Sequence, residues 1–455
     1  MNKNSKKNNK NHNNANNNAL KNSQNQNDID LEIEGDDDMP RNLLAIDAGN
    51  GIFKLAYKVA NKVSEINDKD ITLLDFPATV EADIKTNNDT DTIYINDKKC
   101  KANSGIKIGQ RDDTVKKTNI HTVANIHYAM YLTYKETGVK KFDLAVGVTQ
   151  DIFENDYYKA IYKGEILNIN TNKSLKLKDD EPFSEPYKIS FREEGEKEVT
   201  LEITSLYIRA EAVSGLSTEL TNVRKDIVKN ALKLEGKEGT DKEVKELDKK
   251  VVQEIVNSKR LWVVDLGTLT SHYTIYENRT TTLKGVLHHG YVHLAKGFIG
   301  YLEVTKQKQN DFNAIDKIIR QRRNEEDLKF YTQNIYLEEI KSDLEKYGAD
   351  FERDHFLFIG GTSDELKECI KEVFTTNTTI AVDGFHANVL GMFKRLIFEV
   401  NTAREREKKR KALEREKERA KAEREKARLE KEQQEQQNKE EKAMQEVAVT
   451  KTEDK

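Results

Sequence analysis

The chain has 455 residues, of which 34% are charged, and its formal net charge at pH 7 is −4. This near balance gives no broad positive field of the kind that nucleic-acid-binding proteins use, so we expect the folded body not to bind nucleic acid directly. Two cysteines, Cys100 and Cys369, are too few for a disulfide framework and favour the reducing cytoplasm. No apolar run approaches the roughly 18 residues that a membrane-spanning helix needs, and the N-terminus lacks the apolar core of a signal peptide.

The first 40 residues have low complexity, being rich in asparagine and then acidic at residues 36–38. Such a segment has too little apolar surface to offset the entropy of folding, which predicts a disordered extension over residues 1–40. The functional alternative is a tether, or a segment that binds a partner.

Residues 43–54 read Leu-Leu-Ala-Ile-Asp-Ala-Gly-Asn-Gly-Ile-Phe-Lys. Two apolar runs around a glycine-rich turn predict a β-hairpin with Asp47 at its tip. The glycines let the backbone approach a bulky anion, whose partners would be the amide N–H groups and the positive charge of Lys54. Asp-Gly turns also join ordinary hairpins, so this motif alone does not identify a site. The turn residues are Gly49, Asn50 and Gly51.

A similar pattern returns half a chain later, where residues 260–273 read Arg-Leu-Trp-Val-Val-Asp-Leu-Gly-Thr-Leu-Thr-Ser-His-Tyr. An apolar strand again runs into Asp-x-Gly, with Asp265 in the position of Asp47. Two such hairpins suggest a duplicated architecture, in which each half offers one carboxylate and one amide-rich turn to opposite sides of a nucleotide. The turn residues here are Gly267, Thr268, Leu269 and Thr270.

A third pattern lies in residues 356–366, which read Phe-Leu-Phe-Ile-Gly-Gly-Thr-Ser-Asp-Glu-Leu. It predicts a strand, a break at Gly360 and Gly361, and a helix that has Thr362 or Ser363 as its N-cap. The two glycines would let a flat base or ribose lie against bare backbone.

In this order the three patterns resemble the phosphate-1, phosphate-2 and adenosine motifs of the actin-like ATPase superfamily, which includes actin, sugar kinases and seventy-kilodalton chaperones. The sequence pattern Asp-x-Gly-Asn-Gly-x-x-Lys is most similar to that of the bacterial ParM/StbA plasmid-segregation actins. Residues 141–149 resemble a strand and turn of that branch, with Thr149 in place of the usual proline, and residues 385–391 resemble its Ala-Asn-x-x-Gly helix. The resemblance covers roughly residues 42–400.

This resemblance implies an α/β, actin-like fold with two related lobes around a nucleotide cleft. After the disordered extension we expect lobe I at 41–215, with a small outer subdomain at about 60–100 and 151–200. Lobe II is expected at 216–400, with a charged insertion at 218–259 and an outer subdomain at about 304–350. A charged helical tail is expected at 401–455.

The resemblance also assigns roles to the polar residues of these motifs. Asp47 and Asp265 would contact Mg²⁺ through water, and Lys54 and the turn residues would hold ATP or GTP. The choice between the two bases stays open, because the residues around Gly360 name no base-specific group.

Two helix starts complete the expected site. Glu211 follows a predicted strand at 201–208 and matches the acidic residue that polarises the attacking water in ParM-like proteins, although Ala210 stands where a proline is usual. A carboxylate there also stabilises the helix dipole, so this plainer interpretation stays open. Lys296 and Gly297 are expected to begin another helix whose amides face the nucleotide.

The implied function is a cytoplasmic, filament-forming ATPase that polymerises with nucleotide, disassembles on hydrolysis and segregates plasmid DNA. Its partners would be other copies of itself and a DNA-binding adaptor bound to a plasmid centromere. The alternative is a non-polymerising NTPase of the same fold, such as a small-molecule kinase or a chaperone-like ATPase. A kinase needs a base near a substrate hydroxyl, and no aspartate lies in an obvious substrate loop; a chaperone would continue into a peptide-binding β-domain, whereas a charged helix follows here.

From Asn401 to about Glu441 the chain is dominated by Arg, Lys and Glu. Acidic and basic residues recur three apart, and each such pair stabilises a free helix by about 0.2–0.5 kcal/mol. The apolar residues are too few and irregular for a heptad seam, so a single solvated helix is favoured over a coiled coil.

Overall fold

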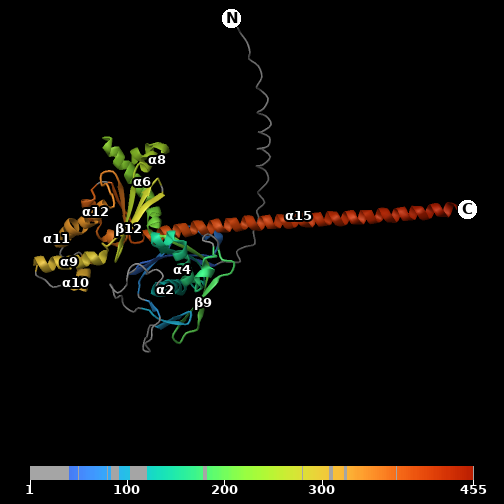
Figure 1. Ribbon diagram of the computed structural model, residues 1–455, viewed down its shortest axis with the longest axis horizontal. Coiled ribbons are helices and arrows are strands. Elements are labelled where there is room, and N and C mark those ends of the chain that lie inside the picture. The colour runs from blue at the N-terminus through green and yellow to red at the C-terminus, as the bar shows by residue number, and fades with distance from the viewer. Residues whose placement is uncertain are drawn as a thin grey trace, which may run out of the picture. The chain divides into compact units, whose positions relative to one another are not determined.

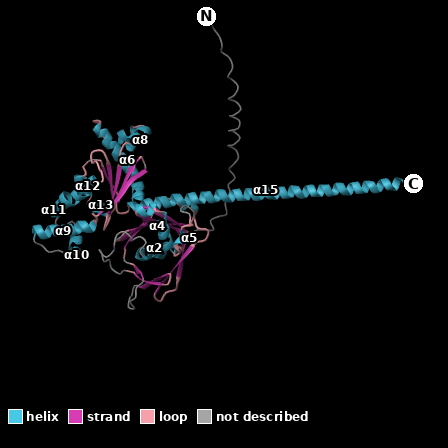
Figure 2. Cartoon of the chain, viewed as in Figure 1, coloured by secondary structure: helices cyan, strands magenta, loops and turns pink. Residues whose placement is uncertain are grey.

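The computed structural model describes residues 40–49, 51–78, 80–82, 92–102, 120–177, 182–278, 280–306, 311–321, 325–375 and 377–453. The extension predicted over residues 1–40 therefore lies outside the described residues, apart from Pro40. The described chain forms two β-sheets with helices packed against them (Figures 1 and 2). No helix within it is both long and apolar enough to cross a membrane.

The first sheet contains nine described strands in the order β3-β2-β1-β7-β9-β8-β5-β6-β4. Strand β1 pairs antiparallel with β2 and parallel with β7, β2 pairs antiparallel with β3, and β7 pairs parallel with β9. Of the strands in the segments expected to form the small outer subdomain, β8, β5, β6 and β4 make up one end of this sheet, whereas β3 pairs with β2 at the other end. The bounds are β1 (Arg41–Ala48), β2 (Ile52–Ala60), β3 (Thr72–Pro77), β4 (Glu81–Ala82), β5 (Thr92–Ile95), β6 (Lys98–Lys101), β7 (Lys141–Val148), β8 (Tyr187–Glu193) and β9 (Val199–Ala210).

The second sheet contains five described strands in the order β12-β11-β10-β13-β14. Its pairings are antiparallel, antiparallel, parallel and parallel, the same series that runs from β3 to β9 in the first sheet. The duplicated architecture predicted from the two Asp-Gly hairpins is therefore confirmed. The bounds are β10 (Leu261–Leu266), β11 (Ser271–Glu277), β12 (Thr280–Leu287), β13 (His355–Ile359) and β14 (Thr378–Ile380).

Helices connect and cover the two sheets. Those of the first half are η1 (Val63–Glu65), α2 (Ile120–Thr137), α3 (Gln150–Glu154), α4 (Asp156–Leu167), α5 (Thr171–Ser174), α6 (Glu211–Leu234), α7 (Asp241–Glu246) and α8 (Lys249–Asn257). Those of the second half are α9 (Tyr291–Lys306), α10 (Phe312–Arg320), α11 (Glu325–Tyr331), η3 (Thr332–Tyr336), α12 (Leu337–Lys346), α13 (Gly361–Glu365), α14 (Lys367–Val373) and α15 (Ala387–Glu453).

The central strands β10 and β13 of the second sheet are largely buried on both faces, to which successive side chains along each strand point in turn. Trp262 and Val264 of β10 pack with the residues of α9 to α12, whereas Val263 between them packs with residues of α6 and α8. Strand β13 divides in the same way, with Phe356 on one side and Leu357 on the other. The sheet accordingly lies between these two groups of helices (Figure 2).

Helices α6 and α15 follow equivalent strands of the two sheets and contact each other through a pair of glycines. A Cβ on Gly215 would lie 2.5 Å from Oδ1 of Asn388, and one on Gly391 would lie 1.9 Å from the carbonyl oxygen of Ser214. Each glycine is the fifth residue of its helix. The missing side chains therefore allow the two backbones to cross closely behind the ends of the central strands.

Two expectations about helices need correction. Helix α9 begins at Tyr291, not at Lys296, because Gly290 places the helix start directly against the turn after β10. The segment 218–259 was expected to be a solvated insertion, but only part of it is exposed to solvent. Helix α6 runs through it to Leu234 and buries Val223 and Ile227 against the second sheet.

The charged tail continues α15 without a break, and Figure 1 shows one helix leaving the body. Buried side chains occur along this helix as far as Ala403, whereas those at residues 405–438 are all exposed. The ion pairs along this part join residues four apart, such as Glu407 with Lys411 at 2.9 Å and Arg428 with Glu432 at 3.3 Å.

Candidate functional site

A cleft of about 1160 Å³ lies where the three predicted turns meet, and both halves of the chain contribute to it. Its walls include the ends of β1, β10 and β13, the start of α6 and the start of α15. Of the residues predicted from the motifs, the following line it: Asp47, Gly49, Gly51, Lys54, Glu211, Asp265, Gly267, Thr268, Leu269, Thr270, Gly360, Gly361 and Thr362. Asn50 lies outside the described residues.

The two hairpin turns have the same internal geometry. A Cβ on Gly49 would lie 2.4 Å from the carbonyl oxygen of Ile52, and one on Gly267 would lie 2.6 Å from that of Thr270. Each turn is thus too tight for any other residue at this position. The turns face each other, because a Cβ on Gly51 would lie 3.2 Å from Cγ2 of Thr268.

Lys54 lies among three carboxylates at the floor of the cleft. Its Nζ is 3.2 Å from Oδ2 of Asp47, and the two side chains are only 12% and 6% exposed. Burial alone would lower the pKa of Lys54, but the negative charges of Asp47, Asp265 and Glu211 outweigh it and raise that pKa. The ammonium therefore stays charged. It also lies 4.5 Å from the ring centroid of Phe385, which closes one side of the cleft.

Asp265 is positioned by residues from distant parts of the chain. Nδ2 of Asn388, in the first turn of α15, donates a hydrogen bond to its Oδ2 at 2.8 Å. A Cβ on Gly360 would lie 2.4 Å from its Oδ1, so the turn at Gly360 and Gly361 packs directly against the same carboxylate. Gly360 has a φ of 92°, which suits glycine.

Glu211 is the first residue of α6, as predicted, and its side chain reaches the cleft. Its Cγ and the Cε of Met392 lie 3.0 and 3.1 Å from the position of a Cβ on Gly147, so the carboxylate stem passes between β7 and α15. Because α6 has no side-chain cap at Ala210, its first amides are not satisfied by a capping group there. Glu211 can therefore stabilise the helix dipole and still face the cleft, so both interpretations fit its position.

The third turn differs in detail from the prediction. Gly360 itself is the N-cap of α13 and no side chain caps that helix, so the expected Thr or Ser cap is wrong. Oγ of Ser363 donates instead to the carbonyl oxygen of Gly360 at 2.6 Å, and Ser363 is buried away from the cleft. Oγ1 of Thr362 donates to the carbonyl oxygen of Gly267 at 3.1 Å, which ties this turn to the second hairpin.

Lys296 and Gly297 do not line the cleft. Lys296 is exposed on α9, and Gly297 lies within that helix, where a Cβ would meet Oη of Tyr331 at 1.9 Å. The amides at the start of α9 are those of Tyr291 and Val292, and they donate to the carbonyl oxygens of Gly267 and Thr268 at 3.0 and 2.9 Å. They therefore brace the second hairpin turn.

Several lining residues had no motif to reveal them. Arg320 at the end of α10 lies 5.3 Å from the ring centroid of Tyr291 and pairs with Asp316 at 2.9 Å. His272 faces Asp265 across the β10–β11 pair, the position that Lys54 holds opposite Asp47. Aligning the two hairpins could have identified His272, whereas Arg320 sits in an unmarked charged helix. The other lining residues outside the motifs include Asp151, Asn155, Tyr158 and His288. Asp364, Glu365, Phe385 and Asn388 also line the cleft; they lie within the marked segments 356–366 and 385–391, although the motifs gave them no individual role.

The donor set fits a polyphosphate with a divalent cation. Two tight turns with glycine backbones face each other, a charged lysine lies between them, and two aspartates offer oxygen ligands from opposite sides. Beside them Oδ1 of Asn388 is buried and has no hydrogen-bond partner within the described chain, so it can still accept a hydrogen bond from a ligand.

Comparison with known proteins agrees with this architecture. No protein-family model matches the sequence, and no curated protein matches it either. The crystal structure of the apo psk41 ParM protein matches with a TM-score of 0.51 and 14% identity, over 80% of this chain and 100% of that one. The crystal structure of Ta0583, an archaeal actin homologue, matches with a TM-score of 0.51 and 13% identity, over 78% and 99%. The chain has a ParM-like actin fold, which confirms the resemblance drawn from the motifs.

Proposed function

We propose that this chain is an actin-like NTPase that binds Mg-ATP or Mg-GTP in the cleft and assembles into filaments. One observation carries the enzymatic part. Asp47, Asp265 and Glu211 converge on the buried charge of Lys54, between two turns that face each other. Such a site offers positioning and electrostatic stabilisation, the main means by which proteins catalyse phosphoryl transfer.

Each group has a separate task in this proposal. The amides of the two hairpin turns and the Lys54 ammonium bind the phosphates, and Gly360 and Gly361 leave room for the base or ribose. Asp47 and Asp265 would hold Mg²⁺ through water, and the ion would supply charge stabilisation when bound. Glu211 orients a water molecule and accepts its proton as the water oxygen attacks the terminal phosphorus, which breaks the bond to the nucleoside diphosphate.

The filament part rests on the ParM-like fold. Both halves of the chain contribute walls to the cleft, so a bound nucleotide would set the angle between the lobes and with it the surfaces that meet in a filament. In keeping with the resemblance, the partner that connects such filaments to plasmid DNA would be a DNA-binding adaptor. The exposed tail of α15 is available for contacts outside the body.

The test combines hydrolysis, sedimentation and electron microscopy of the purified protein with Mg-ATP, Mg-GTP or no nucleotide. We expect phosphate release, and filaments that pellet only with nucleotide. Glu211→Gln should slow hydrolysis by about 100-fold while nucleotide still binds and filaments persist. Glu235→Gln, the same change at the exposed far end of α6, is the matched control and should hydrolyse at the parental rate.

The outcomes separate the alternatives. Hydrolysis without pelleting at any protein concentration would remove the filament part and favour a non-polymerising NTPase of this fold. Neither binding nor hydrolysis of either nucleotide would overturn the proposal as a whole. A parental rate for Glu211→Gln would leave Glu211 with only its role at the helix terminus.

A further inference from the structure

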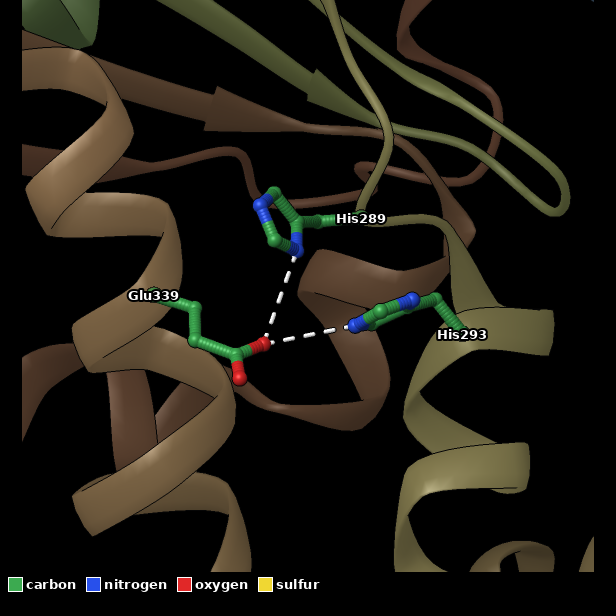
Figure 3. Close-up of side chains that lie close together, drawn as sticks. All are labelled: His289, His293 and Glu339. Carbon is green, nitrogen blue, oxygen red and sulfur yellow. Dashed lines mark hydrogen bonds and ion pairs between the residues drawn. The ribbon is translucent and has the colours of Figure 1, made fainter. Parts of the chain in front are cut away.

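A cluster of two histidines and a glutamate lies outside the nucleotide cleft, at the junction of α9 and α12. His289 is in the link between β12 and α9, His293 is in the first turn of α9, and Glu339 is in the first turn of α12. Figure 3 shows both imidazoles directed at the carboxylate of Glu339. Nδ1 of His289 is 3.8 Å and Nε2 of His293 is 3.3 Å from the same oxygen, Oε2.

These separations suit a tetrahedral zinc ion. Zinc binds imidazole nitrogen and carboxylate oxygen at about 2.0–2.1 Å, so two ligand atoms on a tetrahedral ion lie about 3.3 Å apart. One of the two measured separations equals this value, and the other exceeds it slightly. All three ligand atoms lie within 4.8 Å of one another, and the half-exposed side chains of His293 and Glu339 can both move to close the site.

The state of His289 points independently to a ligand. The residue is 9% exposed, and its Nδ1 is buried without a hydrogen-bond partner in the described part of the chain. Its other nitrogen, Nε2, lies 2.8 Å from Oδ2 of Asp343, which can only accept a hydrogen bond. Nε2 therefore carries the proton, and the free lone pair of Nδ1 is directed at Glu339.

The backbone that holds His289 is fixed as well. Its carbonyl oxygen accepts hydrogen bonds from Oγ of Ser271 at 2.7 Å and from Oη of Tyr336 at 2.6 Å. The Asp343 carboxylate accepts a hydrogen bond from one ring nitrogen of His289 and leaves the other nitrogen free to bind a metal ion. This is the arrangement that orients metal-bound histidines in proteins. A buried nitrogen held in this way without a partner would cost stability unless something binds it.

We propose that His289 Nδ1, His293 Nε2 and the Glu339 carboxylate bind a zinc ion, with water as the fourth ligand. Two imidazoles favour zinc over Mg²⁺, which prefers an octahedral set of oxygen ligands. The site is thus distinct from the Mg²⁺ site proposed in the cleft.

The position of this site gives it a structural consequence. Gly290, the residue after His289, packs against Thr268 and Leu269, where a Cβ would lie 2.4 Å from the carbonyl carbon of Leu269. A zinc ion that joins α12 to the start of α9 would therefore stiffen the support of the second hairpin turn. Zinc removal should loosen this support and lower the melting temperature.

The experiment titrates the full chain, stripped of metal with a chelator and free of nucleotide, with Zn²⁺ by calorimetry and with Co²⁺ by visible absorption. We expect one ion per chain, the intense absorption of tetrahedral cobalt, and a higher melting temperature with zinc. Excess Mg²⁺ should not compete. His293→Ala and Glu339→Gln should each weaken Zn²⁺ binding at least 10-fold, and Asp343→Asn should weaken it by about 10- to 100-fold.

Glu338→Gln is the matched control, since it makes the same change one residue away on α12, where Glu338 pairs with Lys341 instead. It should bind zinc as the parent does. Because His293 and Glu339 are both about half exposed, their variants should stay folded, which circular dichroism checks. Equal zinc affinity in the parent, His293→Ala and Glu339→Gln would overturn the proposal, as would an equal loss in Glu338→Gln. Since no nucleotide is present, these outcomes do not depend on the NTPase proposal.

Discussion

Asn388 donates a hydrogen bond from Nδ2 to Oδ2 of Asp265 over 2.8 Å, and so joins the first turn of α15 to the end of β10. The carboxylate that we assign to Mg²⁺ is thereby oriented by the same helix that continues into the charged tail. Asn388→Ala should leave Asp265 free to rotate and lower the affinity for Mg-nucleotide by about 10- to 100-fold, since a hydrogen bond to a charged group contributes about 1.5–3 kcal/mol. Fluorescent-nucleotide binding measures this.

Asn401→Ala is the matched control for this variant. Asn401 lies on the same helix and donates to the carbonyl oxygen of Ile66 at 3.2 Å, away from the cleft. Its loss should affect the melting temperature without changing nucleotide affinity. If the two alanine variants weaken binding equally, the contact between Asn388 and Asp265 does not position the carboxylate.

Lys284 on β12 connects the second sheet to α3 of the first lobe, beside the cleft. Its Nζ contacts Glu154 and lies 3.1 Å from Oδ1 of Asp151, both on α3. These side chains are partly exposed, so Lys284→Glu should change the free energy of unfolding by less than about 1 kcal/mol. It should nevertheless open the lobes and increase the radius of gyration measured by small-angle X-ray scattering at low salt.

The charge swap tests this reading of Lys284. Lys284→Glu combined with Glu154→Lys restores an opposite-charge pair and should return the scattering curve toward that of the parent. Salt of about 1 M should open the parent in the same way, because it screens exposed pairs. Identical scattering from the parent and Lys284→Glu would show that other contacts set the angle between the lobes.

Buried histidines predict a loss of stability in acid. Burial lowers the pKa of His127 from 6.5 to about 4, although its Nε2 donates to the carbonyl oxygen of Ile166 at 2.8 Å. The unfolded chain therefore binds a proton that the folded chain does not, so stability falls as pH falls from about 7 toward 4. Between pH 7.5 and 5 this residue should cost about 2 kcal/mol, measured by urea unfolding.

His127→Gln should flatten this pH dependence, whatever its effect on stability at pH 7.5. Part of the slope should remain, because burial also lowers the pKa of His355, to about 3. His288→Gln changes an exposed histidine and is the control. A slope that is the same in His127→Gln and in the parent would contradict the assignment.

The structural features that could be predicted are those set by residues close together in the sequence. The hairpins around Asp47 and Asp265 were predicted correctly because apolar alternation and glycine turns are local signals. The duplicated topology followed from comparing the two. Gly297 was mistaken for part of a helix start, since nothing local shows that Oη of Tyr331 occupies the space beside it.

The remaining site residues depend on contacts between distant segments. Arg320 reaches the cleft only because α10 packs near Tyr291, and no pattern in its charged surroundings marks it. His289 and His293 were not singled out from the sequence, although they lie only four residues apart. Their carboxylate partner, Glu339, lies on another helix among many acidic residues, so only the fold could identify it.

The tail of α15 gives the last prediction, which concerns where the packed part of this helix ends. Val400 and Ala403 are buried, whereas every side chain from residue 405 to 438 is exposed. Truncation after Arg404 should therefore leave the melting temperature unchanged, since it removes little buried apolar surface. Truncation after Glu399 should lower it, because it also removes Val400, whose full burial contributes about 1.5–3 kcal/mol. Differential scanning calorimetry of the two truncations measures the difference.

A peptide of the tail and the chain truncated after Arg404 together separate the helicity and self-association of the tail from the activity of the body. Pairs such as Glu407 with Lys411 are exposed, so the helicity of a peptide covering residues 405–453 should fall as salt is added. Leu413 and Leu429 are about half exposed and too far apart to form a seam, so sedimentation should show a monomer. A salt-resistant dimer would instead establish the coiled coil. If the peptide is monomeric and the chain truncated after Arg404 keeps its hydrolysis rate, any change in filament bundling must come from contacts that the tail makes with other molecules.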